Sequence, residues 1–105
     1  MKKIKSYYEL QKIIKEKKRF MLYVSMKNCN ICHVDITKIE KISEENNFIS
    51  YNLEASEVPK AVGQLSLFAV PVVILFYEGK EFHRQAKIID FEELEYRIGQ
   101  ISEKY

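Results

Sequence analysis

The two cysteines of the chain, Cys29 and Cys32, lie between an apolar segment and a segment with helical spacing. Residues 20–24 are all apolar, which predicts a buried strand. After the first cysteine, branched aliphatic side chains recur at intervals typical of one helix face, at Ile31, Val34, Ile36, Ile39 and Ile42. The sequence therefore predicts a Cys-x-x-Cys pair at a strand-to-helix turn, a placement that favours redox chemistry for the two thiols.

The spacing of the cysteines suits a disulfide that opens and closes. Residues three apart on a helix share a face, with Cβ atoms ~5–6 Å apart, and a disulfide tolerates Cα separations of ~4.4–6.8 Å. We expect Cys29 at or just before the first helical residue, where unpaired backbone N–H groups favour the reactive thiolate. Cys32 lies one turn deeper and is predicted to be the shielded thiol that resolves the mixed disulfide formed by Cys29.

Length and composition indicate one globular domain over residues 1–105, because this length supports one core but not two domains. The net charge of +2 is too small to argue for nucleic acid as a partner, and no segment is apolar enough to span a membrane. The lysines near the start are not followed by the apolar segment of a signal peptide, so we expect a cytoplasmic location. In that reducing compartment a lone cysteine pair is more often catalytic, redox-sensing or metal-binding than structural.

The order of predicted elements is helix, strand, helix, strand, helix, strand, strand, helix. In chain order they are a helix capped by Ser6, a strand over 20–25, a helix over 29–45, a strand over 48–53, a short helix capped by Ser56, a strand over 70–77, a strand over 80–87 and a helix capped by Asp90. Strands that alternate with helices imply parallel crossovers, and the last two strands form an antiparallel hairpin. The predicted fold class is α/β, with a central four-stranded mixed sheet flanked by helices on both faces.

With these elements in place, the chain resembles a thioredoxin over nearly its whole length. Three features match in order: the Cys29-x-x-Cys32 turn, Val70-Pro71 opening the next-to-last strand, and Gly79 in the hairpin. The resemblance implies a thioredoxin fold and a protein dithiol/disulfide oxidoreductase that contributes to cell redox homeostasis. It also implies a monomer without a bound cofactor, with disulfide-containing client proteins and a thioredoxin-reductase-type electron donor as partners.

The resemblance further implies how a client protein binds. The Val70–Pro71 peptide bond is expected to be cis and to lie opposite the cysteines. Proline has no N–H and cannot continue a strand ladder, so the backbone of Val70 is left to pair with an extended client segment. Asn28, Asn30 and Ile31 are expected to shape the rim of this site.

The chain departs from the usual thioredoxin pattern around the thiols. Asn28, Asn30 and Ile31 stand where thioredoxins carry Trp and Gly-Pro, and Tyr23 replaces the buried acid of the first strand. Without that acid, the thiol of Cys32 is expected to lose its proton to water, to Tyr23 or to His33.

Two cations flank the cysteines and predict an effect on the redox couple. Lys27 precedes the pair, and His33 lies four residues after Cys29 on the same helical face. Cations there would stabilise the thiolate, and a stabilised reduced form makes a more oxidising couple. The alternative for His33 is an ordinary surface position.

Three alternatives compete with a redox enzyme. Residues 29–33 match the Cys-x-x-Cys-His pattern of covalent haem attachment, but that function requires export and a haem pocket. A zinc site would have only Cys29, Cys32, His33 and His83 as nitrogen and sulfur ligands, so no metal site is expected. The third alternative is a non-catalytic binding module with a thioredoxin fold, which the loss of the buried acid and tryptophan favours.

Overall fold

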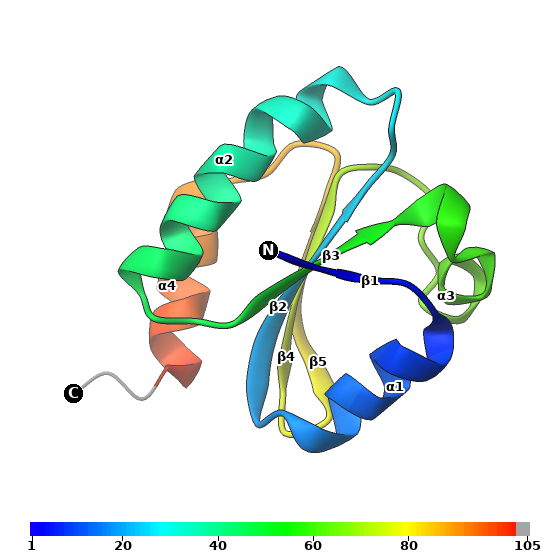
Figure 1. Ribbon diagram of the computed structural model, residues 1–105. Helices are drawn as coiled ribbons and strands as arrows, with labels where there is room; N and C mark the ends of the chain where they lie inside the picture. The colour runs from blue at the N-terminus through cyan, green and yellow to red at the C-terminus, as the bar shows by residue number, and fades with distance from the viewer. Residues whose placement is uncertain (103–105) are drawn as a thin grey trace.

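One mixed sheet of five strands, in the order β1-β3-β2-β4-β5, organises the computed structural model, which describes residues 1–102 (Figure 1). The elements in chain order are β1 (Lys2–Ile4), α1 (Tyr7–Glu16), β2 (Arg19–Ser25), α2 (Asn30–Glu45), β3 (Ser50–Glu54), the 3₁₀ turn η1 (Ala55–Glu57), α3 (Pro59–Gln64), β4 (Val72–Tyr77), β5 (Lys80–Ala86) and α4 (Phe91–Ile101). The predicted α/β fold with helices on both faces is confirmed.

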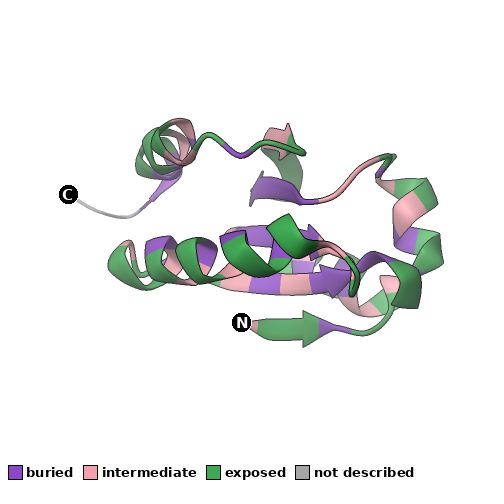
Figure 2. Cartoon of the chain, turned by 90° about the horizontal axis from the view of Figure 1, so that it is seen from above, coloured by how far each residue is buried: buried purple, intermediate pink, exposed green. Residues whose placement is uncertain are grey.

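The central strand β2 divides the core into two layers. Phe20, Leu22 and Val24 pack with α1 and α3, whereas Met21 and Tyr23 pack with α2 and α4. Figure 1 shows these two pairs of helices on opposite sides of the sheet. In Figure 2 the helices carry both buried and exposed residues along their length, as one-sided packing requires. Because both faces of β2 are covered, its sequence is continuously apolar rather than alternating.

The sheet has one strand more than the four expected, because β1 pairs in parallel with the edge of β3. This strand is three residues long, and of these only Ile4 is buried. Two exposed lysines followed by one apolar residue give no periodic signal, so the strand is recognised only through its hydrogen-bonded partner.

Strand β4 runs antiparallel to β2, which corrects the expected parallel crossover at this step. Strand β3 ends, and β4 begins, at the end of the sheet where β2 finishes, since Glu54 pairs with Ser25 and Val72 with Val24. The intervening helix α3 has only six residues and spans about 9 Å. It is too short to return the chain along the sheet, so β4 starts at the end of the sheet where β3 finishes, on the other side of β2.

Side-chain caps fix the starts of the helices around this sheet. Ser6 accepts a hydrogen bond from the backbone N–H of Glu9 at 3.0 Å, and Asp90 caps α4 in the same way, so both predicted caps are confirmed. The predicted cap at Ser56 is wrong, because Glu54 caps the 3₁₀ turn η1, and α3 begins at Pro59 without a side-chain cap. Within residues 1–102, no helix combines the length and apolarity that crossing a membrane demands.

We predict that the edge strand β1 contributes to the core through Ile4, whose side chain is fully buried. The substitution Ile4→Ala should lower the free energy of unfolding by about 2–5 kcal/mol, because it leaves a cavity beside α1 and β3. Urea denaturation measures this loss. The matched control is Lys2→Ala on the same strand, whose exposed side chain should change stability by less than about 0.5 kcal/mol. Equal effects of the two substitutions would show that β1 is not part of the packed sheet.

Candidate redox site

Cys29 and Cys32 form a disulfide at the junction between β2 and α2, with their Cα atoms 5.3 Å apart. Cys29 is the N-cap of α2, and Cys32 lies in the first turn of the helix. The two sulfurs differ in access, because Cys29 is half-buried and Cys32 is only 1% exposed. Of the two cysteines, Cys29 is therefore the more accessible from solvent.

The sulfur of Cys29 occupies the position of a helix-capping oxygen. Its Sγ accepts a hydrogen bond from the backbone N–H of Cys32 at 3.1 Å, while the Cys29 carbonyl accepts one from His33 N at 3.3 Å. The positive end of the helix dipole points at the same sulfur. When the disulfide opens, this environment stabilises negative charge on Cys29, and thiolate is the form that attacks disulfides.

Tyr23 supports the first turn of α2 from the strand beneath it. Its side chain is fully buried, and its hydroxyl donates a hydrogen bond to the carbonyl oxygen of Cys32 at 2.7 Å. Burial, reinforced by the negative charge of Asp35, raises the pKa of Tyr23. The phenol therefore stays protonated at neutral pH and acts as a hydrogen-bond donor. Asn52, on the neighbouring strand, holds the backbone of Tyr23 in turn, through a bond of 3.1 Å to its carbonyl.

Asp35 is a site residue that the sequence analysis missed. It is 6% exposed and lies on the buried face of α2, together with Cys32, Ile39 and Ile42. The predicted apolar face was partly wrong, because Ile31 and Val34 are 49% and 61% exposed. The available signal was the three-residue spacing between Cys32 and Asp35, which places both on one face once the helix is turned correctly.

The two basic residues that flank the cysteines, Lys27 and His33, make contacts that involve the loop between β2 and α2 (residues 26–29), which we call the active-site loop. The ammonium group of Lys27 pairs with Glu57 at 3.3 Å. The ring Nε2 of His33 lies 2.7 Å from the carbonyl oxygen of Lys27, which is a hydrogen bond when Nε2 carries the proton. Both side chains therefore brace the loop that leads to Cys29, in addition to any field they exert on the sulfurs.

Glu54 completes this brace, and nothing in the sequence pattern indicated it. It is the last residue of β3 and is 4% exposed. Its carboxylate accepts hydrogen bonds from the backbone N–H groups of Lys27 and Glu57, each at 3.0 Å, and from the hydroxyl of Ser56. These donors, the Ser56 hydroxyl foremost, hold the pKa of Glu54 below its usual range. A buried carboxylate thus ties the active-site loop to the end of the neighbouring strand.

Val70 and Pro71 lie at the same end of the sheet as the cysteines. The peptide bond between them is cis. Val72 pairs with Val24, so Pro71 lies beside the end of β2, from which the active-site loop departs. Val70 and Met26 line one hollow of about 260 Å³ together with Phe68, whose side chain is 92% exposed.

Lys87, just after β5, contacts the backbone of Pro71. Its backbone N–H donates to the carbonyl oxygen of Pro71 at 2.7 Å, and its φ of 70° lies in the left-handed region that favours glycine. Of the other predicted rim residues, Asn28, Asn30 and Ile31 are all exposed around the disulfide.

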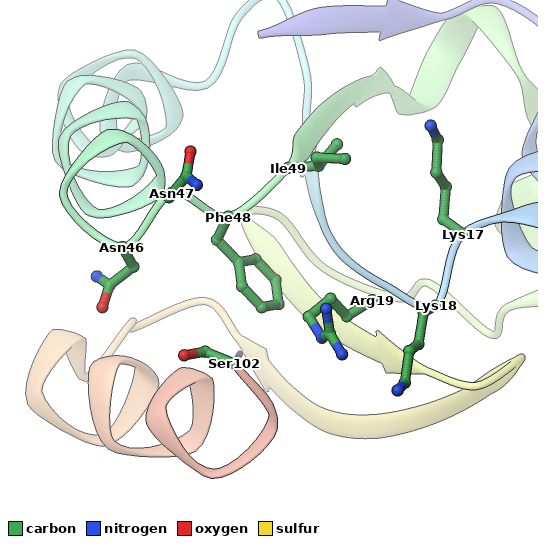
Figure 3. Close-up of a pocket in the computed structure, with 8 residues that line it drawn as sticks. All are labelled: Lys17, Lys18, Arg19, Asn46, Asn47, Phe48, Ile49 and Ser102. Atoms are coloured by element: carbon green, nitrogen blue, oxygen red, sulfur yellow. The ribbon is translucent and has the colours of Figure 1, made fainter. Parts of the chain in front are cut away.

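A second hollow, of about 420 Å³, lies at the opposite end of the sheet (Figure 3). Arg19 at the start of β2 and Phe48 after α2 face it, together with Lys17, Lys18, Asn46, Asn47, Ile49 and Ser102. The length of β2 separates this hollow from the cysteines, because Arg19 begins the strand and Ser25 ends it. It therefore takes no part in the chemistry of the disulfide.

The potential zinc ligands do not all lie at one place. His83 is on β5, beside Gln85, and burial lowers its pKa. Among residues 1–102, no three His, Cys, Asp or Glu side chains gather into a group that holds a metal ion.

We predict that Glu54→Gln loosens the active-site loop, because an amide presents one acceptor oxygen where the carboxylate presents two. The free energy of unfolding should fall by about 1–3 kcal/mol at neutral pH, the cost of leaving buried N–H groups without acceptors. The lowered pKa of Glu54 means that its contribution is present above the ordinary carboxyl value of 4.5 and is lost as pH falls through the folded-state value. Denaturation as a function of pH should therefore show a gap between wild type and Glu54→Gln that closes in acid. The exposed Glu45→Gln serves as control, and a gap of the same size for both variants would contradict the brace.

Comparison with known proteins supports the same fold and family. No family model matches the chain. The thioredoxin-like protein YdfQ of Bacillus subtilis is 30% identical over 101 residues, which cover 95% of this chain and 90% of that protein.

Solved thioredoxin structures match the fold at lower identity. A mutant thioredoxin from Halobacterium salinarum has a TM-score of 0.88 at 15% identity, with 99% of this chain and 92% of that one covered. The Fasciola hepatica thioredoxin has a TM-score of 0.87 at 18% identity and covers 97% and 100% of the two chains. At such identities these structures show the fold alone, whereas the relative from Bacillus subtilis carries the similarity through the sequence. With that likeness and a disulfide at the strand-to-helix turn, the chain belongs to the thioredoxin-like family.

Proposed function

We propose that this protein is a thioredoxin-like protein disulfide oxidoreductase that works through Cys29 and Cys32. The single observation that carries the proposal is the disulfide at the start of α2, with an accessible outer sulfur and a buried inner one. The fold and the close cysteine pair support oxidoreductase activity in general. Exchange of this kind needs no bound cofactor, because the two sulfurs carry the electron pair.

In the proposed reaction, the Cys29 thiolate attacks one sulfur of a client disulfide. A mixed disulfide forms between Cys29 and the client, and the other client sulfur leaves as a thiolate that takes up a proton. The Cys32 thiol then loses its proton and attacks Cys29 Sγ, which forms the Cys29–Cys32 bond and releases the second client sulfur. The client is reduced by two electrons and the protein is oxidised by two. A thioredoxin-reductase-type donor would restore the dithiol.

The client would bind as an extended segment along the edge formed by Val70 and Pro71. Because Pro71 carries no N–H, the backbone of Val70 is available to a strand of the client. Exposed apolar side chains surround this edge, namely Ile31, Val34 and Phe68. Their exposure favours client segments with apolar residues beside the disulfide, since burying such surface stabilises the complex.

We propose further that residues 1–105 act as one monomeric domain in the cytoplasm, where the protein would contribute to cell redox homeostasis. The reducing conditions of that compartment keep an exchange-active pair in its dithiol form between reactions.

The test is insulin reduction with dithiothreitol as the electron source. Wild type should accelerate the reaction, and Cys29→Ser should abolish the acceleration because no nucleophile remains to form the mixed disulfide. Cys32→Ser should trap insulin on Cys29 as a mixed disulfide, which mass spectrometry without reductant detects. Equal and negligible activity of wild type and Cys29→Ser would instead favour the non-catalytic binding module.

A second prediction concerns the apolar rim. Ile31→Ser should raise the KM for insulin about threefold to tenfold with little change in kcat. The substitution removes apolar contact area, and the lost area lowers the binding free energy by about 1 kcal/mol. Ile49→Ser is a matched control, since Ile49 is similarly exposed but lies at the opposite end of the sheet. A KM that responds equally to both substitutions would exclude Ile31 from client binding.

A further inference from the structure

Two carboxylates in the described part of the chain are buried, Asp35 and Glu54. The carboxylate of Glu54 is fully engaged by three hydrogen-bond donors from the loop and η1. Asp35, in contrast, is 6% exposed and is the one charged residue among the buried residues of α2, with Cys32, Ile39 and Ile42. A buried ionisable group retained beside a reactive pair is a candidate for function.

The geometry of α2 brings Asp35 towards Cys32. The two residues are one helical turn apart on the buried face, with Cβ atoms ~5–6 Å apart. Side chains on a helix lean towards its N-terminus, so the carboxylate of Asp35 leans back towards the turn that holds Cys32. Tyr23 on β2 interacts with both residues. Its hydroxyl donates a hydrogen bond to the carbonyl oxygen of Cys32, and the charge of Asp35 contributes to the raised pKa of its phenol.

The other groups that could accept a proton from Cys32 already take part in hydrogen bonds or are excluded by burial. The Tyr23 phenol is protonated and donates its hydrogen bond. The imidazole Nε2 of His33 faces the carbonyl oxygen of Lys27 on the outside of the helix. Water has little access, because Cys32 is 1% exposed. The thiol of Cys32 must nevertheless lose its proton before its sulfur bonds to Cys29.

We propose that Asp35 is the proton acceptor for the Cys32 thiol in the step that closes the Cys29–Cys32 disulfide. The proposal rests on the disulfide exchange proposed above. In that step the S–H bond of Cys32 breaks, and its proton moves to the Asp35 carboxylate directly or through one water. The Cys32 sulfur bonds to Cys29 Sγ, and the client sulfur leaves with the electron pair of the broken mixed disulfide. In the reverse direction, Asp35 returns the proton to Cys32.

The layer of the core on the α2 side of the sheet is lined mainly by apolar groups. From β2 the group that faces Asp35 is the neutral phenol of Tyr23, and β4 contributes the apolar Val73 and Leu75 to this layer. Helix α4 adds Leu94 and Ile98, while its charged residues Glu93 and Arg97 pair with each other at 2.6 Å. On α2 itself, Lys38 lies over the ring of Phe91 at 5.2 Å.

The first test follows closure of the disulfide in a single turnover. Reduced protein is mixed with insulin, the reaction is quenched with acid, and the mixed disulfide on Cys29 is quantified by mass spectrometry between about pH 6 and about pH 9. Asp35→Asn should close the disulfide about tenfold more slowly than wild type near pH 7, so that the mixed disulfide accumulates, and should recover as hydroxide replaces the acceptor. Asp35→Leu, which suits the apolar layer, should be equally slow, whereas the exposed Glu44→Gln on the same helix should match wild type.

The second test needs no turnover and separates a charge effect from a packing effect. In Cys29→Ser the lone Cys32 thiol is titrated by its thiolate absorbance, with and without Asp35→Asn. A carboxylate beside the sulfur opposes the thiolate, so the titration midpoint should drop by at least about one pH unit when Asp35 is replaced.

The outcomes of the two tests distinguish the two proposals. Wild type that reduces insulin, with Asp35 variants that close the disulfide at the wild-type rate and pH dependence, would overturn the role of Asp35 alone. An unchanged titration midpoint of Cys32 would overturn it as well. Wild type without any insulin reduction would remove the proposed exchange, and the role of Asp35 in it, whatever the titration shows.

Discussion

The hydrogen bond from the backbone N–H of Cys32 to the sulfur of Cys29 is the contact on which the site depends. It makes one sulfur both the cap of α2 and one half of the disulfide. The start of a helix provides N–H groups without internal partners, and the end of an apolar strand fixes where that start lies. Strand β2 is covered on both faces, so the position of the cysteines is set by the most buried part of the fold.

The loop between β2 and α2 is held through a single residue. The N–H of Lys27 is bound by Glu54, its carbonyl by His33 and its ammonium group by Glu57. Glu57 also pairs with Lys3 at 2.8 Å, which links the loop to the edge strand β1. These polar contacts hold the loop in place. The buried carboxylate of Glu54 is the part of this network that water screens least.

The arrangement of buried polar groups differs from the usual thioredoxin pattern to which the sequence was compared. The strand position of the usual acid holds Tyr23, and a carboxylate, Asp35, instead lies on the facing helix. The phenol supports the first turn by donating to a backbone carbonyl, and Asp35 lies one helical turn after the inner cysteine among the buried residues of α2. A negative charge there opposes a thiolate, in contrast to the dipole and N–H groups around the outer cysteine.

The sequence by itself determined the order of the helices and strands from α1 onwards, the turn that holds Cys29 and Cys32, the caps at Ser6 and Asp90, and the family. These features depend on local spacing, on strings of apolar residues and on capping residues, all of which act over a few positions of the chain. Only the tertiary structure decided that β1 joins the sheet, that β4 runs antiparallel to β2, and that Glu54 and Asp35 belong to the site. Each of these three features depends on a partner that is distant in sequence or on how a helix is rotated against the sheet. The periodicity of side chains along the sequence contains no information on either.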